Sequence, residues 1–84
     1  MTLLHEMAYV YEVYRQRSFT RAAQALYISQ PSLSQMIRKA EGRIGTTIFD
    51  RSTSPIGLPE AGRASLRAAE QVLQIESDLR RYLD

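Results

Sequence analysis

The chain has 84 residues, 44% hydrophobic and 24% charged, which is enough for one small domain and too few for two. It has no Cys and a single His, which excludes a disulfide framework, a thiolate zinc site and a multi-histidine metal cluster. Its apolar stretches are far shorter than the ~20 residues of a membrane span, and its N-terminus lacks the pattern of an export signal. We therefore expect a cytoplasmic chain that does not act on a membrane.

The net charge of +2 is unevenly distributed along the chain. Residues 15–51 contain seven basic and two acidic side chains, a net charge of +5, whereas the remainder carries −3. Proteins that bind nucleic acids concentrate their cations on one face. The basic middle of the chain therefore indicates where a nucleic acid would bind.

Apolar residues at helical spacing predict two helices at the start of the chain. The stripe that includes Met7 and Tyr14 predicts a helix over residues 3–16. The hydroxyl of Ser18 can cap a second, Ala-rich helix over residues 19–26.

A third helix is predicted over residues 31–44. Pro31 fits the first turn of a helix, where its missing N–H group would have had no partner, and either Ser29 or Gln30 serves as the cap. Gly45 is a suitable C-terminal stop.

The next segment changes character and predicts a small β-hairpin. Residues 46–49 are β-branched or aromatic, residues 50–55 resemble a turn, and residues 56–58 can form a returning strand. Such a hairpin would stand between the third helix and the last one.

From Glu60 to the end, the spacing of apolar and small residues predicts one helix of more than 20 residues with a heptad seam. A helix this long has more apolar surface than so small a core can cover, so part of the seam should contact another chain. The seam consists of Ala61, Ser65, Ala68, Val72, Ile75, Leu79 and Tyr82.

Two short helices joined by a tight turn fit a helix-turn-helix, in which the start of the second helix meets base edges. Arg38 and Lys39, one turn further on, favour phosphate contacts. The alternative is that these polar residues only cover a solvated helix face. The candidate base-reading residues are Gln30, Pro31, Ser32, Ser34 and Gln35.

Other candidate sites are weaker. Arg51, followed by Ser52, Thr53 and Ser54, could contact the DNA backbone or belong to an ordinary hairpin turn. The aromatic residues Phe19 and Tyr27 are expected in the core, because isolated aromatic residues at element junctions usually pack there.

The sequence contains no catalytic constellation. His5 and Glu6 are adjacent on a helix and so do not face each other, and there is no G-x-S-x-G, P-loop or dinucleotide fingerprint. We expect a protein that is not an enzyme.

A series of short motifs covers nearly the whole chain. The motifs are Ser18-Phe19-Thr20-Arg21-Ala22-Ala23, Leu26, Ser29-Gln30-Pro31-Ser32-Leu33-Ser34, Ile37, Glu41, Ile44-Gly45, Ile48-Phe49-Asp50-Arg51 and Glu60-Ala61-Gly62. Together they resemble the N-terminal domain of LysR-type transcriptional regulators. The resemblance implies a mainly α fold, with three helices and a small β-hairpin wing forming a winged helix-turn-helix, followed by a long linker helix. It also implies dimerisation through antiparallel linker helices.

Full-length members of that family add a C-terminal domain that senses a small molecule. We expect this chain to be the DNA-binding fragment, without a cofactor, and an effector to act only through that further domain. Carried over by position, the DNA contacts of the family fall on Thr20, Arg21, Gln30, Pro31, Ser32, Ser34, Gln35 and residues 51–54. Gln35 stands where Arg is common, and the wing is poorer in cations than is usual.

These observations predict a DNA-binding domain over residues 1–58 and a linker helix over residues 59–84. The leading hypothesis is a homodimeric module that reads the major groove of a pseudo-palindromic site in double-stranded DNA. The alternative is a protein-interaction module that uses only the heptad seam. The basic middle discriminates between them, because an interaction module has no reason to concentrate cations there.

Overall fold

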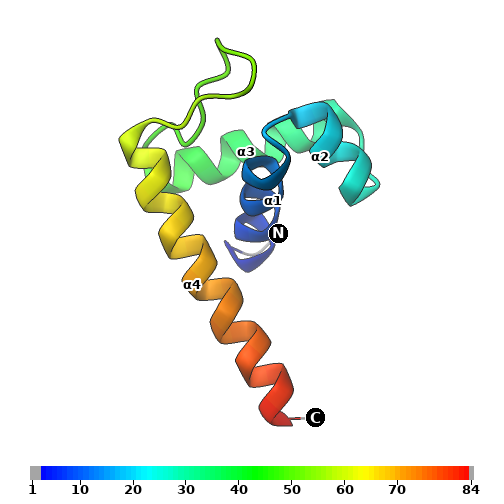
Figure 1. Ribbon diagram of the computed structural model, residues 1–84, viewed down its shortest axis with the longest axis vertical. Coiled ribbons are helices and arrows are strands. Elements are labelled where there is room, and N and C mark those ends of the chain that lie inside the picture. The colour runs from blue at the N-terminus through cyan, green and yellow to red at the C-terminus, as the bar shows by residue number, and fades with distance from the viewer. Residues whose placement is uncertain (1–2, 84) are drawn as a thin grey trace.

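A computed structural model describes residues 3–83 and contains four helices in this range: α1 (Leu3–Gln16), α2 (Phe19–Leu26), α3 (Gln30–Ile44) and α4 (Glu60–Leu83) (Figure 1). The helix bounds expected from the sequence are confirmed within the described residues, except that α3 begins one residue earlier, at Gln30, and α4 begins at Glu60 instead of residue 59. Residue 84, to which the last helix was expected to extend, lies outside the described residues.

Local signals at the helix ends explain these bounds. The hydroxyl oxygens of Ser18 and Ser29 each accept a backbone N–H from the first turn of the following helix, both at 3.2 Å. Ser29, rather than Gln30, is thus the cap of α3, and Pro31 lies in its first turn. Gly45 ends α3 in the left-handed region, at φ 87°, where a residue with a Cβ would be strained.

Helix α1 is the centre of the fold, because it packs against each of the other helices. Among the described helices, α4 packs on α1 alone, and its C-terminal half extends away from the rest of the molecule (Figure 1). The longest dimension is 42 Å, a little more than the ~36 Å expected for a helix of this length. Over residues 3–83, no helix combines the length and apolar character needed to cross a membrane.

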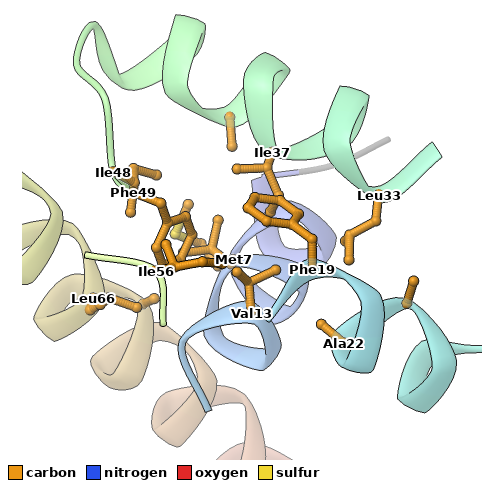
Figure 2. Close-up of a cluster of buried hydrophobic side chains, with 14 residues drawn as sticks. Met7, Val13, Phe19, Ala22, Leu33, Ile37, Ile48, Phe49, Ile56 and Leu66 are labelled. Carbon is orange, nitrogen blue, oxygen red and sulfur yellow. The ribbon is translucent and has the colours of Figure 1, made fainter. Parts of the chain in front are cut away.

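One hydrophobic core joins all the helices and the segment between α3 and α4 (Figure 2). The rings of Phe19 and Phe49 meet edge to face at a centroid distance of 6.2 Å, a favourable arrangement for aromatic pairs. The buried residues are Met7, Val10, Val13, Phe19, Ala22, Ala23, Leu33, Ile37, Ala40, Ile48, Phe49, Ile56, Leu66 and Ala69.

The wing is a loop rather than the hairpin of two strands that the sequence predicts. Only Asp50 and Gly57 pair, with N–H to carbonyl distances of 2.9 and 3.0 Å in the two directions. The expectation of a strand over residues 46–49 is wrong because the last two N–H groups of this segment donate to the carboxylate of Glu41. Successive N–H groups of an extended strand point to opposite sides, so two that meet the same carboxylate oxygen do not belong to a strand.

Tyr27 is a second correction, because its side chain is 94% exposed and does not belong to the core. It ends α2 in the left-handed region, at φ 58°, and its N–H donates to the last turn of that helix. Phe19, in contrast, is buried as expected.

A buried ion pair joins α1 to the end of α3. The Glu6 side chain is 1% exposed, and its carboxylate lies 3.2 Å from Nε of Arg43. A buried carboxylate needs such a partner, so this pair helps to set the position of α3 on α1.

Gly62 allows α4 to pack directly on the backbone of the segment that precedes the wing. A Cβ at this position would lie 1.9 Å from the carbonyl oxygen of Ile48, far inside van der Waals contact. No flexible side chain could yield there, because the opposing atoms belong to the backbone.

We expect Gly62→Ala to lower the free energy of unfolding by about 2 kcal/mol or more, because α4 must move off Ile48 to admit the methyl group. Gly42→Ala is the matched control, since a Cβ on Gly42 meets nothing within 4 Å. At this helical position Ala should stabilise the protein by up to about 1 kcal/mol. Urea unfolding of both variants measures the difference, and equal effects would contradict the close approach of α4.

Candidate nucleic-acid interface

Helix α3 has one buried and one exposed side, which follows from its sequence pattern. Leu33, Ile37 and Ala40 are fully buried against the core. The opposite side carries the polar residues that the sequence singles out. Gln30, Pro31, Ser32, Gln35, Arg38 and Lys39 are exposed, and Ser34 is half-buried.

The turn between α2 and α3 is short, so the start of α3 lies at the surface. The helix-turn-helix therefore presents the side chains of the first turn of α3 to solvent. Thr20 and Arg21, in the first turn of α2, are also exposed. These residues form a polar surface with a basic end at Arg38 and Lys39.

An arginine that is free to contact phosphate would extend from the wing into solvent. Arg51 instead packs against the rest of the domain. Its Nη1 donates to Oγ of Ser34 at 2.5 Å, and its guanidinium carbon lies 4.3 Å from the centre of the Phe19 ring. Its Nη2 lies 3.7 Å from Oε1 of Glu41. Arg51 thereby connects the wing to the exposed side of α3.

The electrostatics of Arg51 reflect this enclosed position. Burial is the main cause that lowers the pKa of its guanidinium, Glu41 opposes the shift, and nearby Arg38 adds to it. Because arginine ionises so far above neutrality, Arg51 keeps its charge. The charge is directed mainly at Glu41 and the Phe19 ring.

Glu41 has a structural role near the site that its place in a sequence motif does not reveal. Its Oε2 accepts the N–H groups of Ile48 and Phe49, at 2.8 and 3.4 Å. The carboxylate thus joins α3 to the segment that leads into the wing. A Glu near the end of a helix, seven residues before a β-branched residue, carries no local signal of such a contact.

The tip of the wing, residues 52–54, is exposed, but two of its hydroxyl groups donate within the turn. The Ser52 hydroxyl and N–H both donate to the carboxylate of Asp50, and they hold the pKa of that carboxyl below its usual value. The Thr53 hydroxyl donates to the carbonyl of Pro55 at 3.1 Å. Residues 52–54 are Ser, Thr and Ser, so the wing tip could contact a phosphate only through hydrogen bonds and not through a charge.

The heptad seam of α4 divides into two parts. Ser65 was expected in the seam, but it is buried within the chain and cannot contact a second chain there. Val72, Ile75, Leu79 and Tyr82 have exposures of 36, 67, 55 and 86%, and Ala61 and Ala68 are also exposed. An open apolar depression of about 370 Å³ lies beside the seam, lined by Met7, Ile44, Ala64, Ser65, Ala68 and Val72.

Comparison with known families decides the classification. The family model described as "Bacterial regulatory helix-turn-helix protein, lysR family" matches residues 4–63. The chain belongs to the LysR family. Its fold is accordingly the LysR-type helix-turn-helix DNA-binding domain.

Relatives of the LysR domain agree with this assignment. The chain is 44% identical over 77 residues to the HTH-type transcriptional regulator YcgK of Bacillus subtilis, covering 92% of this chain and 24% of that protein. It is 46% identical over 72 residues to the regulator BudR of Klebsiella aerogenes, covering 86% of this chain and 50% of that protein. The chain thus spans between a quarter and a half of the length of these regulators.

Solved structures have the same fold. The DNA-binding domain of BenM in complex with catB site 1 DNA superposes with a TM-score of 0.89 at 28% identity, covering 96% of this chain and 86% of that one. Full-length BenM, as the R156H mutant, gives a TM-score of 0.91 over 99% of this chain and 27% of its own.

We expect Glu41→Ala to lower the free energy of unfolding by about 1–3 kcal/mol, because two backbone N–H groups lose their acceptor and the Arg51 guanidinium loses its ion-pair partner. Glu70→Ala, at an exposed position of α4, is the control and should change stability by less than about 0.5 kcal/mol. Chemical unfolding checks both values. A Glu41→Ala variant as stable as the control would show that the carboxylate does not hold the wing.

Proposed function

We propose that this LysR domain binds double-stranded DNA as a homodimer and reads the major groove of a pseudo-palindromic site with α3. The observation that carries the proposal is the polar, exposed side of α3, opposite three fully buried apolar residues. A helix of this kind can place its polar side in the major groove while its apolar side stays in the core of the domain. The similarity to the DNA-binding domain of BenM in its complexes with catB site 1 and benA site 1 DNA supports DNA binding by this domain.

The exposed residues divide into base readers and phosphate contacts. Gln30 and Gln35 carry amides that suit adenine, and Pro31 offers an apolar ring to a thymine methyl group. Ser32 and Ser34 can bond to several bases. The positive charges of Arg38 and Lys39 act on phosphate, which sets register without reading sequence.

Residues outside α3 add backbone contacts. Thr20 and Arg21 lie exposed at the start of α2, and residues 52–54 lie exposed in the wing. We assign them to phosphate. We assign no cofactor or effector site to this chain, and we place its action in the bacterial cytoplasm.

The experiment is selection from pooled random-sequence duplexes, followed by salt titration of the selected duplex against a scrambled control. We expect an interrupted palindrome, and Gln30→Ala should lose about tenfold or more on the selected duplex with a much smaller loss on the scrambled one. Equal losses on both duplexes would defeat the base-reading role. Enrichment of no sequence would favour a protein-interaction module that uses the α4 seam.

The dimer is proposed from the exposed apolar residues of α4. Side chains as apolar as Ile75 and Leu79, repeated along one side of a projecting helix, suit an antiparallel second copy of the same helix. Linking two half-sites in this way makes the second contact intramolecular.

We expect Ile75→Glu to produce monomers, because a charge would be buried between the helices, and to weaken binding to a two-half-site duplex by more than tenfold. Ser77→Glu is the matched control, since Ser77 is exposed on the same helix but outside the seam. Sedimentation at micromolar concentration measures the state of each. A dimeric Ile75→Glu variant would exclude Ile75 from the interface.

A further inference from the structure

The hydrogen bond between Arg51 and Ser34 has only one possible direction. A guanidinium group has donors and no acceptor, so Oγ of Ser34 accepts from Nη1 of Arg51 across the 2.5 Å contact. A hydroxyl group has one hydrogen in addition to its lone pairs. Ser34 therefore keeps its own hydrogen for another partner.

That hydrogen has no acceptor within the described part of the chain, residues 3–83, in which Ser34 makes no further hydrogen bond. Some other hydroxyl groups of the domain, in contrast, donate to an acceptor within it. Ser65 donates to the carbonyl four residues earlier at 2.9 Å, as helical serines often do. Ser52 and Thr53 donate within the wing.

Arg51 itself is poorly placed to contact DNA. Its Nη2 is buried without a hydrogen-bond partner, and its side chain is 28% exposed. Glu41 lies on one side of the guanidinium and the Phe19 ring on another. Its surroundings direct Nη1 at Ser34, which lies on α3 among the proposed base readers.

We propose that Arg51 is a positioning residue that makes Ser34 a hydrogen-bond donor toward an acceptor on DNA. By occupying one lone-pair position of Oγ, Arg51 leaves fewer positions for the hydroxyl hydrogen, and the position that the proposal assigns to it points toward DNA. The recognised chemistry is a hydrogen-bond acceptor, such as N7 of a purine, O6 of guanine or O4 of thymine on a base edge, or a phosphate oxygen. This inference rests on the proposed function of α3.

The first test is a double-mutant cycle on the ratio of affinities for the selected and scrambled duplexes. Removal of a positive charge lowers the affinity for both duplexes equally, so this loss cancels in the ratio. Ser34→Ala should lower the ratio about threefold to tenfold, and Arg51→Met should lower it to a similar extent. Arg51→Met should have no further effect in the Ser34→Ala background, whereas losses that multiply would overturn the proposal.

A matched cycle uses Ser32, which is exposed on the same helix and is bonded to Ser29 instead of Arg51. The effects of Ser32→Ala and Arg51→Met should multiply. Arg51→Lys keeps a donor near Ser34 and should restore part of the affinity ratio. If Arg51→Lys behaved like Arg51→Met although its thermal unfolding matched the parent chain, directed donation would be wrong.

The second test removes acceptors from the DNA one at a time, with 7-deazapurines for N7, 2-aminopurine for O6 and 4-thiothymine for O4. Methylphosphonate linkages are the phosphate arm. One substitution should weaken the parent chain and leave Ser34→Ala unaffected, and its class identifies the acceptor. If every substitution weakens both proteins equally, Ser34 donates to no acceptor on the DNA.

The two proposals fail in different ways. A parent chain that selects no sequence contradicts the proposed function of α3. A parent chain that selects a sequence, but whose Arg51 and Ser34 effects multiply, contradicts only the positioning role. The acceptor test on Ser34→Ala needs no Arg51 variant, so it decides the donor role even if Arg51→Met unfolds.

Discussion

The fold depends on how the two residues Ile48 and Phe49 are held between α3 and α4. Their side chains are buried in the core, and their N–H groups are bound by the Glu41 carboxylate. The carbonyl of Ile48 lies where only a glycine, Gly62, allows a helix to approach. The side chains, the N–H groups and the Ile48 carbonyl of this short segment are thus all held by neighbouring elements. Because α4 packs directly on the segment, the segment sets the angle at which α4 leaves the domain.

The same constraint explains why the wing and α3 act as one unit. Arg51 follows the held segment by two residues, so its side chain starts from a fixed position and reaches Ser34 and Glu41 on α3. The paired residues Asp50 and Gly57 close the loop on the other side. A wing with one bridge would be weakly ordered by its own hydrogen bonds, but here its base is fastened by side chains of a neighbouring helix.

The sequence predicts well what local chemistry determines. Pro31, Ser29 and Gly45 each act within a turn of their own position, so the bounds of α3 follow from short-range rules. Tyr27 was misplaced because its exposure depends on a left-handed backbone that hydrophobicity does not encode. Residues 46–49 do not form a strand because the N–H groups of Ile48 and Phe49 both turn toward Glu41, and the position of Arg51 depends on Ser34, seventeen residues away. The DNA contacts and the dimer seam remain predictions.

The fixed position of Arg51 also affects how the charge of the domain can be used. A cation that faces Glu41 and an aromatic ring contributes little to the release of counterions from DNA, which requires direct neutralisation of phosphate. In the proposed interface, the exposed cations Arg21, Arg38 and Lys39 would supply the salt-dependent part of the affinity. With few such cations, we expect weak non-specific attraction and a larger share of the binding energy from base contacts of α3. A domain that binds in this way would gain selectivity, because other DNA would hold it only modestly.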